Sequence, residues 1–470
     1  MGKLIPMGCI EALPGDTIQQ ATSALIRVSP LVAPVMHPVK VRIHHWFVPH
    51  RLVWDDWEDF ITGGPSNDDP TTFPTIDLSS VTRGSLADYL GVPITGSSVA
   101  VSALPFRAYA LIWNQFYADQ DLDTQLTIDT TDGPDSTTST TLKSVNWEKD
   151  YFTTARPWTQ KGSAVSLPIG TVAPVVTNDE NIRMKGSTFT DREMTTQGSG
   201  YVAPDTGGAS STYLRFGTES GLEADLSNAT AATINELRTA FAMQSFAENR
   251  ARFGSRFVEY LRSLGVRSSD GRLDRPEYLG GGRQTIQFSE VLQTGVDSTD
   301  GGLGNLGGHG ISALRSNRYR RFFEEHGYVI SCLSVQPKTI YTQGLPKHMI
   351  KTTKEEFFQK ELQFIGQQEI YNKEVYLPHS SPDAIFGYND RYDDYRRQES
   401  KVAGEFHDSG GLEHYHMARI FSGDPTLNAS FVNSNPTDRI YASTSNDQLY
   451  VMANHSIQAR RIVAKVGRPR

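Results

Sequence analysis

An alternating run near the N-terminus, VKVRIHHWFV (39–48), constrains the fold of this chain more than any other feature. It places Val39, Val41 and Ile43 on one face with polar side chains between them, which is the period of a half-buried β-strand. A second strand-like run, YVISCLSVQP, follows at 328–337. With 40 glycines and 24 prolines among 470 residues, the chain favours turns and short strands over a helical bundle. We therefore expect a mainly β protein.

Several short helices are expected between the strands. Residues 105–117 (PFRAYALIWNQFY) carry apolar side chains at helical spacing, and Pro105 suits a first turn. Capping-box patterns predict two more helices, one that begins at Thr233 and could run toward Gly265 with a break at Gly254, and one that begins at Thr353 and continues through FFQKELQFI.

Residues 166–230 differ from the rest of the chain because Gly, Ser, Thr and Asn predominate. A disordered linker would explain this composition. The segment nevertheless holds more apolar residues than a tether needs, among them Tyr201, Tyr213 and Phe216. A surface excursion with weak strands of its own is the interpretation that fits better.

The overall charge and the cysteines exclude several classes of protein. A net charge of −8 does not suggest a dedicated nucleic-acid binder. Cys9 and Cys332 are too few for a disulfide scaffold or a cysteine zinc site, and their apolar neighbours predict buried free thiols in a reducing compartment. No signal peptide and no apolar run of membrane-spanning length is present, so we expect a soluble protein without membrane insertion.

One motif suggests a nucleotide site, and its context argues against that site. GLGNLG (302–307) matches the dinucleotide fingerprint, but a polar loop precedes it where a buried strand is needed. The sequence also lacks a phosphate-binding P-loop, a G-x-S-x-G elbow and a Cys/His nucleophile pattern. We predict no enzyme, no catalytic residue and no cofactor.

Histidines occur in two groups, one at His44, His45 and His50 and the other at His414 and His416. Neither group has a cysteine or carboxylate at the spacing of a metal motif. We predict no metal site and expect these histidines to face solvent or neighbouring subunits.

Basic residues gather at the end of the chain, where we expect a basic C-terminal tail over 456–470. Such a tail could neutralise phosphates without reading a base sequence. A solvated tail, or a contact to an acidic neighbour, explains it equally well. The candidate DNA-facing residues of the tail are Arg460, Arg461, Lys465, Arg468 and Arg470.

The stretch NWEKDYFTTARPWTQKG (146–162) mixes aromatic and cationic side chains. Taken alone, it favours single-stranded nucleic acid, and Arg156 and Lys161 stay candidates for that contact. Because it lies immediately before the 166–230 excursion, we interpret it mainly as an anchored junction in which Pro157 fixes the exit direction. The candidate junction or subunit-interface anchors are Trp147, Tyr151, Phe152 and Trp158, together with Trp54 and Trp57.

Seven segments in the same order resemble the major capsid protein of the Microviridae, small single-stranded-DNA phages, and in particular its gokushovirus-like branch. They spread from residue 4 to about residue 375. They are EALPGDT (11–17) with ALIRVSPLVAPVMH (24–37), FVPHRLVWDDWEDFI (47–61), KDYFTTARPWTQKG (149–162), RPEYLGGG (275–282), SEVLQT (289–294) and LSVQPKTIYTQGLP (333–346).

The resemblance implies an eight-stranded antiparallel jelly-roll with long insertions between strands. Residues 1–470 would form one capsid domain whose core is assembled from discontinuous segments. Sixty copies would build a T=1 icosahedral shell around a circular single-stranded DNA genome. The 166–230 insertion would form a threefold protrusion that binds a host cell-surface receptor, with Tyr201, Tyr213 and Phe216 as candidate host-facing residues.

The same resemblance implies partners and a location. A small basic DNA-binding virion protein and a minor pilot protein are expected beside the shell, which would form in the host cytoplasm and remain in the virion. The alternative is a carbohydrate- or receptor-binding jelly-roll module with no role in a shell. A cupin-like enzyme would need clustered His and Glu ligands, which the sequence lacks.

Overall fold

The computed structural model describes residues 1–64, 70–163, 165, 175–177, 183–185, 192–197, 201–204, 215–216, 222–224, 234–253, 273–292, 294, 306–407, 411–445 and 447–463. The chain divides into two compact units. The large unit comprises Met1–Thr159 and Arg252–Arg470, and the small unit comprises Gln160–Ala251.

The first sheet of the large unit is built around two long antiparallel strands, β3 (Val39–Pro49) and β16 (Gly327–Pro337). β1 (Ile5–Ala12) lies outside β16 and β12 (Glu277–Thr285) lies outside β3, in the order β1-β16-β3-β12. Alternate residues of the N-terminal half of β3 are fully buried, so the strand predicted at 39–48 is confirmed with its inward face.

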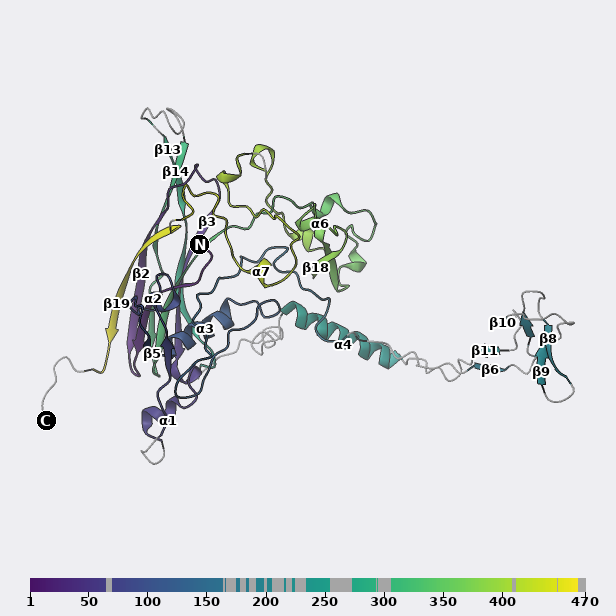
Figure 1. Cartoon of the computed structure of the whole chain (residues 1–470), viewed down its shortest axis with the longest axis horizontal. Coiled ribbons are helices and arrows are strands. Elements are labelled where there is room, and N and C mark those ends of the chain that lie inside the picture. The colour runs from purple at the N-terminus through teal and green to yellow at the C-terminus, as the bar shows by residue number, and fades with distance from the viewer. Residues whose placement is uncertain are drawn as a thin grey trace. The chain divides into compact units, whose positions relative to one another are not determined.

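The second sheet is built around β2 (Thr17–Val28). β14 (Leu306–Arg315) and β15 (Tyr319–Phe322) pair with successive parts of one side of β2, and β13 (Gln287–Leu292) lies beyond β14. β19 (Leu449–Arg460) pairs with the other side of β2 along its whole length (Figure 1).

The two sheets pack face to face over one apolar core. Ile26 of β2 and Leu314 of β14 meet Ile43 of β3 and Leu333 of β16 in it, and all four side chains are buried. Burying such side chains is the main favourable term in folding. The chain is therefore mainly β, with the antiparallel sandwich of a jelly-roll, as the sequence predicted. The strands in the described residues do not close into a barrel.

The helix α3 (Leu104–Phe116) covers the other face of the first sheet. Its buried Phe106, Tyr109 and Ile112 share a cluster with Trp46 of β3 and Ile330 of β16. The predicted helix over 105–117 is confirmed, with Pro105 in its first turn. β3 and β16 are consequently buried on both faces.

Shorter elements complete the large unit. β4 pairs with β5, and β17 pairs with β18. Their bounds are α1 (Trp57–Thr62), β4 (Thr75–Leu78), α2 (Leu86–Tyr89), β5 (Val99–Ser102), β17 (Gln367–Tyr371), α6 (Asn372–Val375), β18 (Ile385–Asp390) and α7 (Ala429–Val432). The single-turn 3₁₀ helices are η1 (His50–Leu52), η2 (Lys347–Met349), η3 (Lys360–Leu362), η4 (Asp393–Arg396), η5 (Gly404–Phe406) and η6 (Glu413–Tyr415).

The helix predicted from Thr353 onward is wrong. The carboxylate of Glu356 does accept the backbone N–H of Thr353 at 2.9 Å, as a capping box requires, but turns follow and only η3 forms. Phe357, Phe358 and Phe364 are 50%, 55% and 88% exposed. A short helix depends on the packing of its apolar face, and this face has no covering element among the described residues of the subunit.

The small unit contains short strands and most of the helix α4 (Ile234–Phe253). One sheet has the order β10-β7-β8-β9, and β11 pairs with β6. The helix predicted from Thr233 is confirmed over α4, which ends one residue before the break predicted at Gly254, and Thr233 and residues 254–265 lie outside the described ones. The strand bounds are β6 (Val175–Thr177), β7 (Arg183–Lys185), β8 (Arg192–Gln197), β9 (Tyr201–Pro204), β10 (Arg215–Phe216) and β11 (Leu222–Ala224).

Candidate functional site

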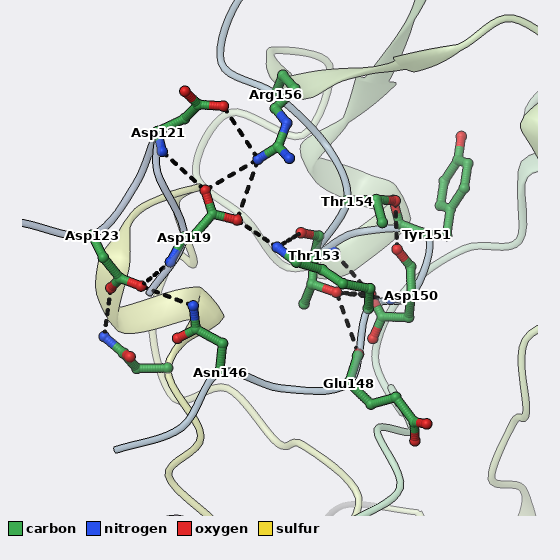
Figure 2. Close-up of polar contacts among 12 residues, drawn as sticks. Asp119, Asp121, Asp123, Asn146, Glu148, Asp150, Tyr151, Thr153, Thr154 and Arg156 are labelled. Atoms are coloured by element: carbon green, nitrogen blue, oxygen red, sulfur yellow. Dashed lines mark hydrogen bonds and ion pairs between the residues drawn. The ribbon is translucent and has the colours of Figure 1, made fainter. Parts of the chain in front are cut away.

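The segment predicted as a junction, 146–162, begins at a group of hydrogen bonds around the carboxylate of Asp123. The side chain of Asp123 accepts the amide groups of Asn146 (2.8 Å) and Asn433 (3.0 Å), as Figure 2 shows for its labelled residues. The backbone N–H of Trp147 donates to the carbonyl of Val432 at 2.8 Å. These bonds join three parts of the chain that are far apart in sequence.

Two cations of this segment converge on Asp119. Arg156 Nη1 lies 3.2 Å from Asp119 Oδ1 and 3.6 Å from a carboxylate oxygen of Asp121, and Lys149 Nζ also pairs with Asp119 (Figure 2). Burial alone would raise the pKa of Asp119, but the charges of Lys149 and Arg156 outweigh it and lower that pKa. Arg156, a candidate DNA-facing residue, is thus held by acids of its own chain.

A tight turn follows at Asp150. Asp150 Oδ1 accepts the backbone N–H of Phe152 (3.0 Å) and of Thr153 (2.8 Å), and its other oxygen accepts the hydroxyl of Tyr341 at 3.0 Å. An aspartate that caps its own turn in this way fixes the backbone direction. The turn directs Tyr151 and Phe152 inward.

Tyr151 and Phe152 are buried in an apolar cluster of their own subunit. Phe152 packs edge-on against Tyr341, with ring centroids 4.8 Å apart, and the cluster includes Phe386 and Phe431. Aromatic pairs with this geometry are favourable beyond their buried area. The two residues lie inside the fold, where they attach the segment to the 341–432 region.

The other two tryptophans of the segment differ from each other. Trp147 is 4% exposed and lies beneath the guanidinium of Arg419, 5.4 Å from the ring centroid. Trp158 is half-buried, and its indole N–H has no hydrogen-bond partner among the described residues.

Trp57 begins α1, and Trp54 lies three residues before it, with the two ring centroids 5.8 Å apart. Trp54 is fully buried and packs against Phe60 and Phe73 at 4.7 and 5.4 Å. Trp57 is half-buried and its ring lies 4.5 Å from that of His50. Trp54 therefore serves the core of its own subunit, while part of Trp57 remains at the surface.

The remaining basic candidates have separate environments. Arg461 pairs with the buried carboxylate of Asp16, Nε to Oδ2 at 3.0 Å. Arg460 is exposed at the end of β19. Lys161 belongs to the small unit, where its backbone N–H donates to the carbonyl of Ala247 (3.4 Å).

Several predicted residues lie outside the described ones or in strands without described side chains. Lys465, Arg468, Arg470 and Tyr213 lie outside the described residues. Tyr201 begins β9 and Phe216 ends β10. The segment expected as a tail over 456–470 begins inside β19, which ends at Arg460.

His45 and His50 do not face solvent, so the expectation is wrong for these two residues, whereas His44 is partly exposed. His45 is fully buried between the sheets, with Nδ1 2.8 Å from the hydroxyl of Ser331, and burial lowers its pKa to about 4. His50 is 2% exposed, and burial likewise lowers its pKa to about 4. Within the described residues no cluster of His, Cys, Asp or Glu could hold a metal ion.

Both cysteine thiols are expected from the sequence to be buried. Cys332 is buried, which confirms the expectation, whereas Cys9 is exposed, so the expectation is wrong for Cys9.

The glycine motif at 302–307 runs into a strand. β14 begins at Leu306, where a dinucleotide site would need a helix. A side chain at Gly308 would lie 2.5 Å from the carbonyl of Ala33, so this glycine allows two backbones to approach closely. Residues 302–305 lie outside the described ones.

Two features were not found from the sequence. Arg107 of α3 and Asp135 form an ion pair, Nε to Oδ2 at 2.8 Å, with both side chains fully buried. β19 was interpreted partly as a tail, although the run LYVMANHSIQA (449–459) contains no Asp, Glu, Lys or Arg. An uncharged run of that length just before a basic end is the signal that would have indicated a strand.

Three relatives and one family model match almost the whole chain. The model described as "Capsid protein (F protein)" matches residues 1–469. Capsid protein VP1 of Bdellovibrio phage phiMH2K is 38% identical over 464 residues, which cover 94% of this chain and 87% of that protein. Capsid protein VP1 of Chlamydia phage 1 is 31% identical over 94% of this chain and 88% of its own length. Capsid protein VP1 of Spiroplasma virus 4 is 31% identical over 96% of this chain and 89% of its own length.

No helix in the described part of the chain is long and apolar enough to span a membrane.

Proposed function

The chain belongs to the capsid protein (F protein) family and is a shell-forming capsid protein of a virion, and we propose that sixty copies of it build a T=1 icosahedral shell around a circular single-stranded DNA genome. The observation that carries the proposal is the family match over residues 1–469, joined to an antiparallel two-sheet sandwich that suits a jelly-roll capsid subunit. The family favours a structural role over an enzymatic one.

Exposed apolar side chains supply surfaces for contacts between copies. On α4, Phe241, Met243 and Phe246 are 66%, 58% and 58% exposed. Aromatic residues and methionine are enriched in protein interfaces, and exposed apolar side chains that lie together commonly mark a binding surface. The α4 surface is therefore a candidate contact between neighbouring subunits.

The basic end of the chain is our candidate for the DNA contact. Arg156 and Arg461 already neutralise carboxylates of their own chain. We therefore place the contact on Lys465, Arg468 and Arg470, which follow the last described residue. Because the net charge of the chain is −8, the phosphate charges of a packaged genome require cations from another source. A small basic virion protein fits that need, and a minor pilot protein is proposed on the resemblance alone.

The small unit is our candidate for host attachment. The 166–230 insertion lies within Gln160–Ala251, a unit with its own short sheets. Such a unit can change in sequence without altering the sandwich, which suits a threefold protrusion that meets a cell-surface receptor. Assembly in the host cytoplasm belongs to the same proposal.

Expression of the chain alone tests the shell. Closed particles should appear in negative-stain micrographs, and sixty subunits of 52.1 kDa should sediment as a species of about 3.1 MDa. A monomer that persists under assembly conditions would contradict the proposal and favour the carbohydrate- or receptor-binding alternative.

Two variants test the finer parts. Substituting Lys465, Arg468 and Arg470 by Gln should lower the DNA content of particles, whereas the charge-matched control Lys354→Gln, Lys360→Gln and Lys401→Gln should not. Equal DNA content in both would remove the tail from the DNA contact. Deletion of residues 170–228 should leave assembly intact and abolish attachment to the host, and loss of shells instead would show that the insertion serves assembly.

A further inference from the structure

β19 is an edge strand with one open side. All twelve of its residues pair with β2 without a register shift. No other strand in the described part of the chain pairs with β19. Its open side therefore presents backbone groups that need partners, either water or another strand.

The hydrogen-bond pattern identifies which residues face that open side. Ser29 and Gln448 continue the ladder one position beyond Val28 and Leu449, and the N–H of Ser29 donates to the carbonyl of Gln448 at 3.0 Å. In an antiparallel ladder, hydrogen-bonded and non-hydrogen-bonded pairs alternate. The even-numbered residues of β19 therefore bond to β2. The odd-numbered residues direct N–H and C=O outward, and they are Leu449, Val451, Ala453, His455, Ile457 and Ala459.

The other outer strands of the sandwich have features that discourage pairing with a further strand, and β19 lacks these features. β1 contains Pro6 and an irregularity between Pro6 and Gly8. β12 has a bulge at Tyr278/Gly280, where Gly280 has φ 142°. β13 is only six residues long and carries Glu290. Proline, bulges, charges and short length all discourage pairing between edges.

β19 has none of these devices from Leu449 to Ala459, which contain no proline, no bulge and no Asp, Glu, Lys or Arg. Tyr450, Val451, Met452 and Ile457 are 52%, 42%, 73% and 42% exposed. A long, regular and uncharged edge is expected to pair with another strand.

A groove runs along the same edge of the sandwich. It lies between β1 and β19 and has a volume of about 640 Å³. Its lining is mixed, with apolar side chains such as Met7 and Val451 and charged ones such as Lys3 and Asp447. His455 of β19 donates from Nε2 to the carbonyl of Met7, one of the residues that line the groove, at 2.9 Å. Inward-facing side chains of β19 thus stay partly uncovered beside the open backbone edge.

We propose that β19 pairs antiparallel with β19 of a second copy across a twofold axis, so that the second sheets of two subunits become one continuous sheet. The proposal rests on shell formation by this chain, because a closed shell requires contacts between identical copies. A twofold axis makes this contact self-complementary, and strand addition at a sheet edge is a common mode of recognition.

The charges at the two ends of β19 suit this arrangement. Asp447 precedes the strand and is exposed, and Arg460 ends it and is exposed. Neither forms an ion pair with any residue that the structure describes, whereas Arg461 is held by Asp16. When two strands pair antiparallel about Asn454, Asp447 lies opposite Arg461 of the partner subunit and Arg460 lies opposite Gln448 of the partner subunit, so no like charges meet at either end.

Crosslinking tests the pairing directly. In particles carrying Cys9→Ser, Asn454→Cys should form a disulfide-linked dimer, because opposite residues of a non-hydrogen-bonded pair lie about 4.5 Å apart at Cα. The matched control is Ser23→Cys, which lies beside Asn454 on the exposed face of β2. Two copies of Ser23 would be three strand spacings apart, about 14 Å, and should not crosslink. Wild-type shells without the Asn454→Cys dimer would overturn the pairing.

Two variants test the backbone and the charges. Ala453→Pro removes an outward N–H while leaving the bonds to β2, so it should fold and lower the yield of shells at least tenfold. Asp447→Arg brings like charges opposite each other at both ends of the pair, so it should lower the yield of shells several-fold. Unassembled protein should keep its tryptophan fluorescence spectrum in each case. Normal shell yields from a folded Ala453→Pro variant would overturn the inference, whereas failure of the wild type to assemble would overturn the proposed function itself.

Discussion

β16 and β19 are strands of eleven and twelve residues that belong to the two sheets of one sandwich. All residues of β16 but one are buried, while most residues of β19 are exposed. β16 has strand neighbours on both sides, the second sheet over one face and α3 over the other. β19 has β2 on one side, and the described residues place no strand on the other. The difference separates residues that stabilise the subunit from residues that are available to a neighbour.

The comparison predicts that substitutions around β16 change the free energy of unfolding, whereas those on β19 change the yield of shells. All six tryptophans lie in the large unit, so their fluorescence reports its unfolding in denaturant.

The largest loss of stability is expected from Arg107→Met, in the layer that covers the first sheet. It leaves the carboxylate of Asp135 buried without its cation, which should cost about 3–5 kcal/mol. Denaturant unfolding measures the loss. The double variant Arg107→Met/Asp135→Asn should recover part of it, and a single variant as stable as the wild type would contradict the importance of this pair.

A matched pair of isoleucines compares the two strands directly. Ile330 of β16 is fully buried, and Ile330→Ala should cost about 3 kcal/mol. Ile457 of β19 is 42% exposed, and Ile457→Ala should cost less than about 1 kcal/mol while lowering the yield of shells. Equal unfolding losses in the two variants would remove the distinction between the strands.

The buried histidines predict a dependence of stability on pH. Burial lowers the pKa of His45 to about 4, below the usual 6.5, so the unfolded chain binds the extra proton between those values. Stability should therefore fall as the pH falls from 6.5 to 4, by at most about 3 kcal/mol for this residue. His45→Gln should reduce the fall measured between pH 7 and pH 4.5. The exposed His348→Gln is the control, and an unchanged fall in both variants would exclude His45 as the cause.

The smallest effect is expected where β3 reaches the surface. Lys40 and Arg42 pair with Glu148 at 2.5 and 3.0 Å, and all three side chains are partly exposed. Glu148→Gln should cost less than about 1 kcal/mol, and the cost should vanish in high salt. A loss as large as that of Arg107→Met would show that exposure does not decide the strength of these pairs.

Sequence patterns predicted the elements in which buried side chains recur at a regular spacing along the strand or helix. The alternation of Val39, Val41 and Ile43 and the helical spacing of 105–117 follow from burial of one face, so both elements were found. The predicted helix at Thr353 did not form because its local capping signal is correct but no element among the described residues covers its apolar face. Local signals cannot report that absence.

The candidate site was less predictable for two reasons. His45 occupies an inward position of β3, and only the hydroxyl of Ser331, 286 residues away in sequence, makes that position suitable for a histidine. β19 pairs with β2 across more than four hundred residues of sequence, and no short-range pattern encodes such a pairing. The acids that hold Arg156 likewise come from a separate loop.

Hydrogen exchange along β19, measured on the same protein before and after assembly, tests the central claim most directly. In the unassembled subunit, the amides of Tyr450, Met452 and Asn454 should be protected by β2, and those of Val451, Ala453 and Ile457 should exchange freely. Assembly should protect the second set as well, while β16 stays protected throughout. Free exchange of Val451, Ala453 and Ile457 in closed shells would contradict the account.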